Sequence, residues 1–377
     1  MTRSDYFRAP VLPGMLGWLI VCLSLAACSL TEKHEIPSAR GVTDLVLLYH
    51  TDSSRPAWTP EQIRPYLYRT GPGGTPEWMF DGLLFVEFIH TKNGKTYTFD
   101  LDAYGRIYAD RACWEELADA MLAEGRGPDA AEQVLADLAA RGYEPPYKRQ
   151  IVFSLPNPAY GMKNWGALNG KALDFTDPAD RIAAIDWYVD RIVEIWKKKN
   201  YRYLDLAGFY WTKEFVNDRP DADDRVLTQV KARLDSLGYS FCWIPYYGAD
   251  GAADWKAHGF DVAYQQPNHF FSTETPDWFL PESIKYAKTH GLKMEMEFDE
   301  RVEEPAFAER YYKYIDAFER AGVWENMPVA YYQGNDAWLR LAQSDKPEMQ
   351  AMYKKLGDIL FRRRGKFSVL LGGADAR

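Results

Sequence analysis

The stretch "GLKMEMEFDE", residues 291–300, alternates methionine with glutamate inside a segment that otherwise has the composition of a buried strand. Because successive strand residues face opposite sides, Glu295 and Glu297 share one face, and Met294 and Met296 share the other. A carboxylate without a partner is costly to bury. The alternation therefore predicts methionines that pack against helices and glutamates that point into a barrel, Glu295 deeper and Glu297 nearer its mouth.

Seven other stretches of the chain have a comparable length and apolar content. The eight predicted strands are residues 44–50, 82–89, 149–155, 202–210, 240–246, 261–266, 292–298 and 327–333. Segments of helical period separate them, which is typical of parallel strands joined by helices. Eight such units without a break in composition predict one (β/α)8 TIM barrel, an α/β fold, over residues 44–365. An open doubly wound sheet is the alternative, but no glycine-rich phosphate loop follows a strand.

Local signals place the helices and one insertion. Asp177-Pro178 offers an N-cap followed by a proline at the first helical position, and Gly291 is suited to end a helix. Asn93-Gly94 lies between alternating residues and predicts a hairpin after the second strand. The loop region after strand 2 is therefore expected to be enlarged and to overhang the barrel mouth.

The N-terminal residues have the layout of an export signal. Two arginines precede an apolar run that ends in Leu25-Ala26-Ala27-Cys28, which resembles the lipobox of bacterial lipoproteins. We expect a signal peptide over residues 1–27, a lipid anchor on Cys28, a tether over residues 28–43 and a C-terminal tail over residues 366–377. The protein would then be held on a membrane of the cell envelope. An ordinary cleaved signal with a chance cysteine is the alternative.

Composition excludes several classes of partner. The formal net charge is -9, and "FRRRGK" near the end is the one basic cluster, so nucleic acid is not expected to bind. The six histidines show no metal-ligand spacing, and we expect neither a metal nor another cofactor. Aromatic residues make up 15% of the chain, which favours a surface that stacks on flat ligand faces.

The ends of the predicted strands are rich in acids, amides and aromatic residues. In barrels of this class the loops that follow the strands form the face where reactions occur. Amides and carboxylates bind hydroxyl groups, and aromatic rings cover the faces of sugars, so a carbohydrate ligand is expected. The predicted substrate-binding residues are Tyr49, Glu87, Asn157, Trp211, Tyr246, Tyr247, Gln266, Asn268, His269, Asp299, Gln333 and Asp336.

Alternative roles remain open for the acids. Glu295 and Glu297 could form a structural ion pair with Lys293 or with a basic residue of a neighbouring strand. On the fourth strand, alternation with Leu204 and Leu206 turns Asp205 inward, where it would orient a neighbouring group. Glu214 follows that strand, at a point where alternation no longer decides its direction.

Carboxylates at the ends of strands 4 and 7 resemble the arrangement in retaining glycoside hydrolases built on (β/α)8 barrels. The resemblance implies that Glu214 is the acid/base and Glu297 the nucleophile, although Lys213 stands where those families commonly have asparagine. The motifs "FYWTKEF", "WIPYYGADG" and "AYYQGND" also make most of the chain similar to an uncharacterised barrel family found among lipoproteins of polysaccharide-degrading bacteria.

The resemblance implies hydrolysis of an oligosaccharide or polysaccharide by two carboxylates, with retention favoured over inversion. Asp299, Asp336 and Glu87 are substitute acids if Glu214 points away. The alternative function is a surface lipoprotein that binds glycan at a barrel mouth without cutting it, which would need the aromatic residues but no converging acids.

Overall fold

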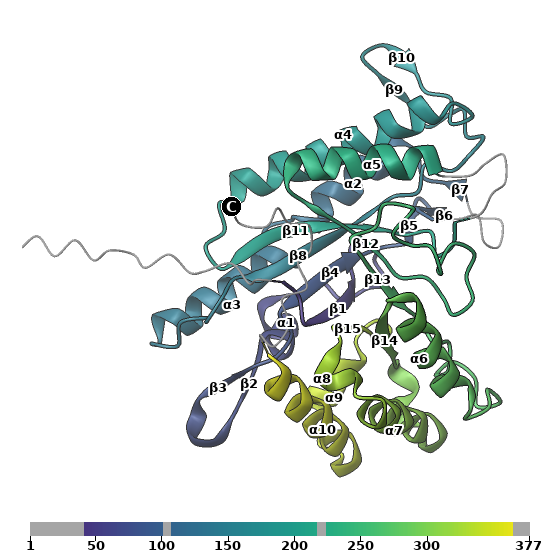
Figure 1. The fold of residues 1–377 in the computed structure, drawn as a ribbon. Helices are drawn as coiled ribbons and strands as arrows, with labels where there is room; N and C mark the ends of the chain where they lie inside the picture. The colour runs from purple at the N-terminus through teal and green to yellow at the C-terminus, as the bar shows by residue number, and fades with distance from the viewer. Residues whose placement is uncertain (1–40, 101–106, 217–223, 365–377) are drawn as a thin grey trace, which may run out of the picture. The chain divides into compact units, whose positions relative to one another are not determined.

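The centre of the protein is a closed barrel of eight parallel strands (Figure 1). The computed structural model describes residues 41–100, 107–216 and 224–364 of the 377-residue chain. The barrel strands are β1 (Asp44–Tyr49), β4 (Gly82–Val86), β8 (Arg149–Leu155), β11 (Leu204–Trp211), β12 (Ser240–Trp243), β13 (Val262–Gln265), β14 (Lys293–Glu297) and β15 (Val329–Tyr332). They follow one another around the ring in chain order, and β1 pairs with β15 to close it. The prediction of a (β/α)8 barrel is confirmed.

Helices cover the outside of the barrel. They are α1 (Pro60–Leu67), α2 (Arg111–Met121), α3 (Pro128–Ala140), α4 (Pro178–Lys199), α5 (Asp224–Leu237), α6 (Phe279–His290), α7 (Pro305–Arg320), α8 (Val323–Asn326), α9 (Ala337–Gln343) and α10 (Pro347–Arg363). The predicted caps are present, because Asp177 accepts a hydrogen bond of 2.9 Å from the backbone of Ala179, and Gly291 ends α6 with a φ of 70°.

Short strands and short 3-10 helices lie outside the barrel. They are β2 (Tyr68–Thr70), β3 (Pro76–Trp78), β5 (Ile89–Lys92), β6 (Lys95–Thr98), β7 (Ile107–Tyr108), β9 (Ala167–Leu168), β10 (Lys171–Ala172), η1 (Pro72–Gly74) and η2 (Glu300–Glu303). β5 and β6 form an antiparallel hairpin whose turn is Asn93-Gly94, both with positive φ. The hairpin and helices α2 and α3 separate β4 from β8, so the second barrel unit is enlarged.

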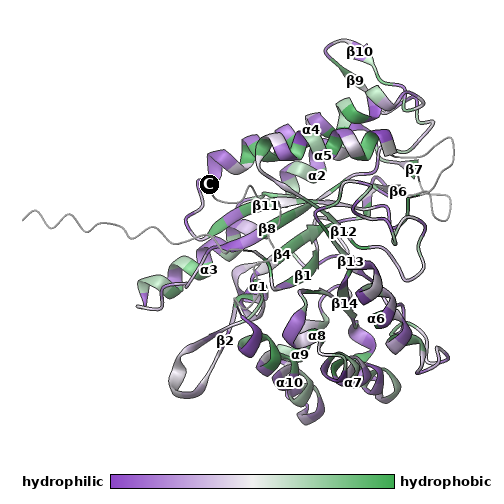
Figure 2. Cartoon of the chain, in the orientation of Figure 1, coloured by the Kyte–Doolittle hydropathy of each residue, from purple (hydrophilic) through white to green (hydrophobic). Residues whose placement is uncertain are grey.

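Two apolar clusters fill the fold. The inner cluster lies within the barrel and contains Val42, Leu45, Leu47, Leu84, Val86, Val152, Ala207, Tyr210, Cys242, Ile244, Val262, Tyr264 and Ala330. The outer cluster lies between strands and helices, and it includes Met294 and Met296. In Figure 2 the barrel strands are coloured largely as hydrophobic, whereas the helices carry both colours. Cys242 in the inner cluster and Cys113 in the outer one are free thiols.

The last helix is fastened to the first strand by a buried ion pair. Arg363 of α10 donates a hydrogen bond of 2.9 Å from Nε to Asp44 Oδ1 at the start of β1. The hydroxyl of Tyr331 on β15 donates to the same oxygen at 2.7 Å. A buried charge of this kind is tolerated only with such partners. The seam between β1 and β15 is therefore held by polar contacts as well as by the strand ladder.

The predicted signal segment, Cys28, most of the tether and the C-terminal tail lie outside the described residues. Among the helices of the described part, none has the length and apolar character that crossing a membrane requires.

Candidate active site

A cavity of about 170 Å³ lies at the ends of the barrel strands. Residues on or just after seven of the eight strands, all but β8, line it together with one loop aromatic: Leu47, Tyr49, Phe88, Tyr210, Glu214, Ile244, Gln266, Phe271, Glu295 and Tyr332. The cavity is thus at the C-terminal face, where enzymes of this fold place their reacting groups. It is smaller than a typical site for a drug-sized ligand, which spans about 300–1,000 Å³.

Strand β14 orients its side chains as its alternation predicts. Met294 and Met296 are fully buried in the outer cluster, against the helices. Glu295 pairs in register with Ala330, which belongs to the inner cluster, and Glu297 pairs with Tyr332, which packs against that cluster. The glutamates of β14 therefore lie on the face of the strand opposite the methionines.

Glu295 brings a carboxyl group into the cavity without a basic partner. Its side chain is only 2% exposed, and its Oε1 atom has no hydrogen-bond partner among the described residues. Burial raises the pKa of Glu295 well above its ordinary value, and the nearby carboxyl groups of Glu297 and Glu214 raise it further. In the described part of the chain Glu295 forms no ion pair with Lys293 or any other base, so the structural alternative for this residue is not realised.

Glu214 supplies the second carboxyl group of the cavity from the loop after β11. The amide Nε2 of Gln266 donates a hydrogen bond of 2.7 Å to its Oε1 atom. Burial raises the pKa of Glu214, while the bond from Gln266 lowers it because a donor stabilises the ionised form. Burial raises the pKa of Tyr210, which also lines the cavity, and the carboxyl groups of Glu214 and Glu295 raise it further.

Glu297 is not part of the cavity lining, and its predicted place beside Glu214 needs correction. Its oxygens accept hydrogen bonds from the backbone nitrogens of Asn268 at 2.9 Å and His269 at 3.2 Å, and from the hydroxyl of Tyr314 on α7. Burial raises its pKa to about 7 against these donors. The loop after β13 and helix α7 thus hold this carboxyl group sideways, and Glu295 takes its place in the cavity.

A β-bulge in β11 decides which aromatic side chain reaches the cavity. The register with β8 shifts between Leu206 and Gly208, so that Ala207 is an extra residue. After the shift Tyr210 belongs to the inner cluster and Trp211, which is fully buried, to the outer one. The prediction that Trp211 binds substrate is therefore wrong, and Tyr210 is the residue that lines the cavity.

Gly208 makes the bulge possible. A Cβ atom at this position would lie 2.4 Å from the backbone oxygen of Ser240 on β12, closer than real Cβ contacts allow. Asp205, near the N-terminal end of β11, forms an ion pair of 3.3 Å with Lys148, which directly precedes β8. It does not line the cavity.

Two of the twelve predicted binding residues, Tyr49 and Gln266, line the cavity. The acids among the others are occupied by arginines, since Glu87 pairs with Arg55 at 3.1 Å, Asp299 with Arg301 at 2.6 Å, and Asp336 with Arg340 at 2.7 Å. The three substitute acids are thus engaged in ion pairs outside the cavity lining.

The remaining predicted residues have structural surroundings. Gln333 is fully buried and accepts hydrogen bonds from Tyr66 and from the backbone of Trp338. Tyr247 packs edge-on against Phe279 of α6. The others also lie outside the lining: Asn157 is buried, Tyr246 forms an isolated bridge with Gln266, and Asn268 and His269 supply the backbone donors to Glu297.

His269 is fully buried, and its ring lies beside Arg310. Burial and the charge of Arg310 lower the pKa of its ring to about 4, so the ring is neutral near pH 7. Across the described ranges, no group of three or more His, Cys, Asp and Glu side chains is arranged to hold a metal ion.

Sequence reasoning missed several lining residues. Phe88, Ile244 and Leu47 are apolar and carry no chemical signal, although Leu47 alternates with Leu45 on the inner face of β1. Tyr332 could have been found, because it alternates with the inward Ala330 and its ring lies 6.0 Å from that of Tyr49.

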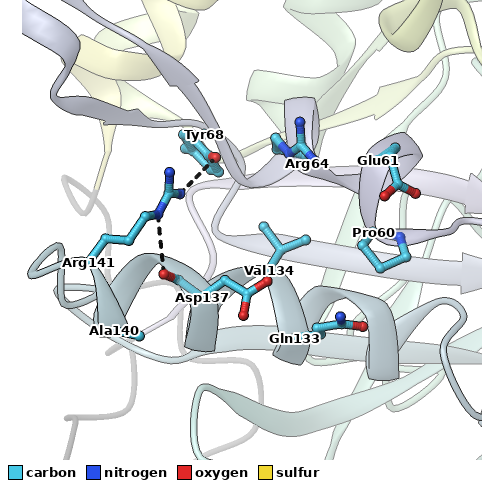
Figure 3. A pocket seen from close by; sticks show the side chains of 9 residues that line it. All are labelled: Pro60, Glu61, Arg64, Tyr68, Gln133, Val134, Asp137, Ala140 and Arg141. Atoms are coloured by element: carbon cyan, nitrogen blue, oxygen red, sulfur yellow. Dashed lines mark hydrogen bonds between the residues drawn. The ribbon is translucent and has the colours of Figure 1, made fainter.

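A larger cavity of about 570 Å³ lies outside the barrel, between helices α1 and α3 (Figure 3). Arg141 crosses it with a hydrogen bond of 3.4 Å to the hydroxyl of Tyr68. The lining alternates acids with bases: Pro60, Glu61, Arg64, Tyr68, Gln133, Val134, Asp137, Ala140 and Arg141. It has neither the buried acids nor the aromatic walls of the barrel cavity, which we take as the candidate site.

Fold and site define a (β/α)8 barrel protein with one buried and one half-buried carboxyl group, those of Glu295 and Glu214, at its C-terminal face. Residues 44–358 match the model of the domain of unknown function DUF4855, and the chain belongs to this family. This confirms the resemblance to an uncharacterised barrel family. No curated protein shows significant sequence similarity to the chain.

Solved structures with a similar fold include enzymes that act on glycans. The chitinase ChiB of glycoside hydrolase family 18 from Flavobacterium johnsoniae aligns with a TM-score of 0.41 and 10% identity, over 85% of this chain and 95% of that one. The endo-1,4-beta-D-mannanase of Thermotoga petrophila RKU-1 aligns with a TM-score of 0.40 and 11% identity, over 85% of this chain and 99% of that one. The spore cortex-lytic enzyme SleL of Bacillus megaterium QM B1551 aligns with a TM-score of 0.42 and 10% identity, over 86% of this chain and 75% of that one. Likeness at this level carries no weight for activity.

Proposed function

We propose that the protein is a glycoside hydrolase and that Glu214 and Glu295 are its two catalytic acids. The observation that carries the proposal is that these carboxyl groups, from strands 4 and 7 of the barrel, line one small buried cavity. Glycoside hydrolysis needs two acids on either side of the scissile bond, one protonated and one ionised. Glu297, which the resemblance to retaining enzymes implied as nucleophile, is replaced in this proposal by Glu295.

The hydrogen bonds of the two acids support different protonation states. Gln266 donates to Glu214 and thereby favours its ionised form, whereas Oε1 of Glu295 has no donor and Glu297 lies nearby. The proton is therefore placed on Glu295 and the negative charge on Glu214. This assignment is the reverse of the one that strand position in the retaining barrel hydrolases implies.

The reaction follows from these states. The Glu295 carboxyl transfers its proton to the glycosidic oxygen as the bond from that oxygen to the anomeric carbon breaks, so that the leaving sugar departs as an alcohol. Glu214 either attacks the anomeric carbon, forming an ester that water later hydrolyses with the help of Glu295, or removes a proton from an attacking water. We favour the first course, with retention, on the resemblance.

The walls of the cavity support a sugar ligand. Tyr49, Phe271 and Tyr332 present aromatic rings to it, and aromatic faces cover the apolar faces of pyranose rings. With a volume of about 170 Å³, the cavity has room for a small unit and not for a long oligosaccharide. We therefore propose that one sugar ring of the substrate enters the barrel while the rest of the chain lies across the mouth.

The test is to incubate the protein with a panel of plant, host and microbial polysaccharides and to follow released sugars by NMR. Glu295→Gln and Glu214→Gln should each lower the rate by about 10²- to 10⁴-fold. Glu61→Gln is the matched control. Glu61 is exposed on α1, and its substitution should leave the rate unchanged. Full activity in Glu295→Gln would remove this acid pair from consideration.

A second experiment separates the two roles. With an aryl glycoside whose leaving group needs little protonation, the variant of the proton donor should recover much of its rate, whereas the variant of the ionised acid should not. We expect recovery for Glu295→Gln. If saccharides bind but neither the parent protein nor any variant cleaves them, the chain is a glycan-binding barrel instead.

A further inference from the structure

A second cavity, of about 250 Å³, lies beside the proposed active site. It is formed by the loop after β1 and the turn between α2 and α3, and the side chains that give it character are His50, Thr51, Asp52, Arg55 and Arg126. Arg55 lines this cavity, and its guanidinium carbon lies 4.7 Å above the ring of Tyr49, which lines the barrel cavity. One layer of side chains therefore separates the two spaces.

The cavity contains buried polar groups without partners. His50 is 2% exposed, and neither ring nitrogen has a hydrogen-bond partner among the described residues. Burial and the charge of Arg126 lower the pKa of its ring to about 4, while the carbonyl of Ala120 acts in the opposite direction. A neutral ring offers one N–H donor and one acceptor. The carbonyl of Ala120 is close to the ring but outside hydrogen-bond geometry, so the buried ring loses free energy that a ligand would recover.

The backbone around His50 is also unusual. Thr51 has a φ of 98°, a region that a β-branched residue rarely occupies, and its Oγ1 atom has no partner among the described residues. Gly127, the N-cap of α3, lies so close that a Cβ atom on it would be 2.9 Å from Nε2 of His50. Strained backbone of this kind concentrates at functional sites.

The charges that face the cavity are mostly positive. Arg126 forms no ion pair within the described ranges, and the positive end of the α3 dipole begins directly after it. Arg55 is held by Glu87 and Asn335. Asp52 is the opposing charge, but its oxygens already accept bonds from Ser54 and Thr91 at 2.7–2.9 Å. The free donors belong to His50, Thr51 and Arg126.

We infer that this second cavity binds an anionic substituent, a carboxylate or a sulfate, of the saccharide whose ring occupies the barrel cavity. The inference rests on the proposed function and adds a substrate class to it, the acidic saccharides. Arg126 would contribute a charge-assisted hydrogen bond, with His50 and Thr51 as neutral donors. The stacking of Arg55 on Tyr49 would couple the two parts of the substrate.

Direct binding tests the inference independently of turnover. Glucuronate, glucose 6-sulfate and glucose are titrated into protein carrying Glu295→Gln, with calorimetry for affinity and long-range ¹H–¹⁵N NMR of labelled histidines to observe the His50 ring. We expect at least one anionic sugar to bind about tenfold or more tightly than glucose and to shift the His50 signals. The carboxylate and sulfate arms identify which substituent fits.

Arg126→Gln should lower the affinity for the anionic sugar by about tenfold, which abolishes its preference over glucose, and should leave the affinity for glucose unchanged. The matched control is Arg141→Gln, since Arg141 follows the 13-residue helix α3 that Arg126 precedes, roughly 20 Å away at 1.5 Å per residue. Equal affinity for all three sugars, or a preference that survives Arg126→Gln, overturns the inference. If the protein cleaves only neutral glycans, the inferred anion site is refuted while the proposed hydrolase function stands. If anionic sugars bind but no glycan is cleaved, the anion site stands while the hydrolase function is refuted.

Discussion

The Nε2 atom of Gln266 donates one hydrogen bond of 2.7 Å to Oε1 of Glu214 and another of 2.9 Å to the carbonyl of Ile244. Three successive loops at the barrel mouth thus meet at one amide. Because that amide cannot rotate without losing the second bond, it presents a donor to Glu214 in a fixed direction. This donor is what distinguishes the surroundings of Glu214 from those of Glu295.

Replacing Gln266 should move one limb of the pH–rate profile. Gln266→Leu removes the donor and so raises the pKa of Glu214 further. If Glu214 acts in its ionised form, the acidic limb of kcat/KM shifts to higher pH. The exposed Gln133→Leu on α3 should leave both limbs in place. A shift of the basic limb alone would show that Glu214 is the proton donor.

Glu297→Gln is expected to lower stability more than activity. The substitution sets an amide NH₂ against the donors Asn268, His269 and Tyr314, which costs roughly 1–3 kcal/mol at about pH 5. The rate on a cleaved glycan should stay within about tenfold of the parent, since Glu297 is outside the cavity. Urea unfolding and initial rates measure the two effects. A loss of activity as large as that of Glu295→Gln, with unchanged unfolding, would restore Glu297 as a catalytic acid.

The contribution of Glu297 to stability should depend on pH with a defined sign. Its pKa is about 7 in the folded protein against an ordinary 4.5, so between these values the folded state holds the proton more tightly. Its contribution is complete below about pH 4.5 and is lost as the pH rises through about 7. The stability difference between the parent and Glu297→Gln should therefore fall by on the order of 3 kcal/mol from about pH 5 to 8, so that it disappears or reverses sign by pH 8. A gap that widens would show that the pKa is lowered.

Substitutions of two neighbouring aromatic residues should have opposite effects, one on activity and the other on stability. Tyr210→Phe removes a phenol that lines the same cavity as Glu214 and Glu295, so kcat/KM should fall about tenfold with little change in melting temperature. Trp211→Phe opens space in the outer cluster and should cost roughly 1–3 kcal/mol of stability while activity persists. The reverse pattern would mean that the bulge in β11 is absent in solution.

The lipid anchor stays a proposal that fractionation can test. With Cys28→Ala the protein should move from the membrane fraction to the soluble fraction, because the acyl chains provide the hydrophobic attachment. Incorporation of labelled palmitate should disappear in parallel. Unchanged membrane association would favour an attachment that does not involve Cys28.

The barrel was predictable because its signals are local. Alternating apolar runs recur eight times, and caps such as Asp177-Pro178 mark the helix ends, so each strand and its helix can be found from about 30 residues of sequence. The direction of Met294 and Met296 follows from the same two-residue period. Such regularity needs no knowledge of distant parts of the chain.

Which acids and aromatic residues line the site could not be predicted in the same way, because it depends on contacts that leave no periodic pattern in the sequence. The carboxyl group of Glu297 is drawn aside by two backbone nitrogens and by Tyr314, which lies on a different helix, and no sequence pattern reports that contact. The extra residue Ala207 reverses the faces of Tyr210 and Trp211, and only Gly208 hints at it. Sequence therefore located the strand ends and misjudged which side chains meet there.

The bond between Arg363 and Asp44 joins residues 319 positions apart, and β1 can find its second neighbour only in β15. During synthesis on the ribosome, the first strand must wait with one edge unpaired until nearly the whole chain has emerged. Release of a shortened polypeptide that lacks β15 would leave that edge open to self-association.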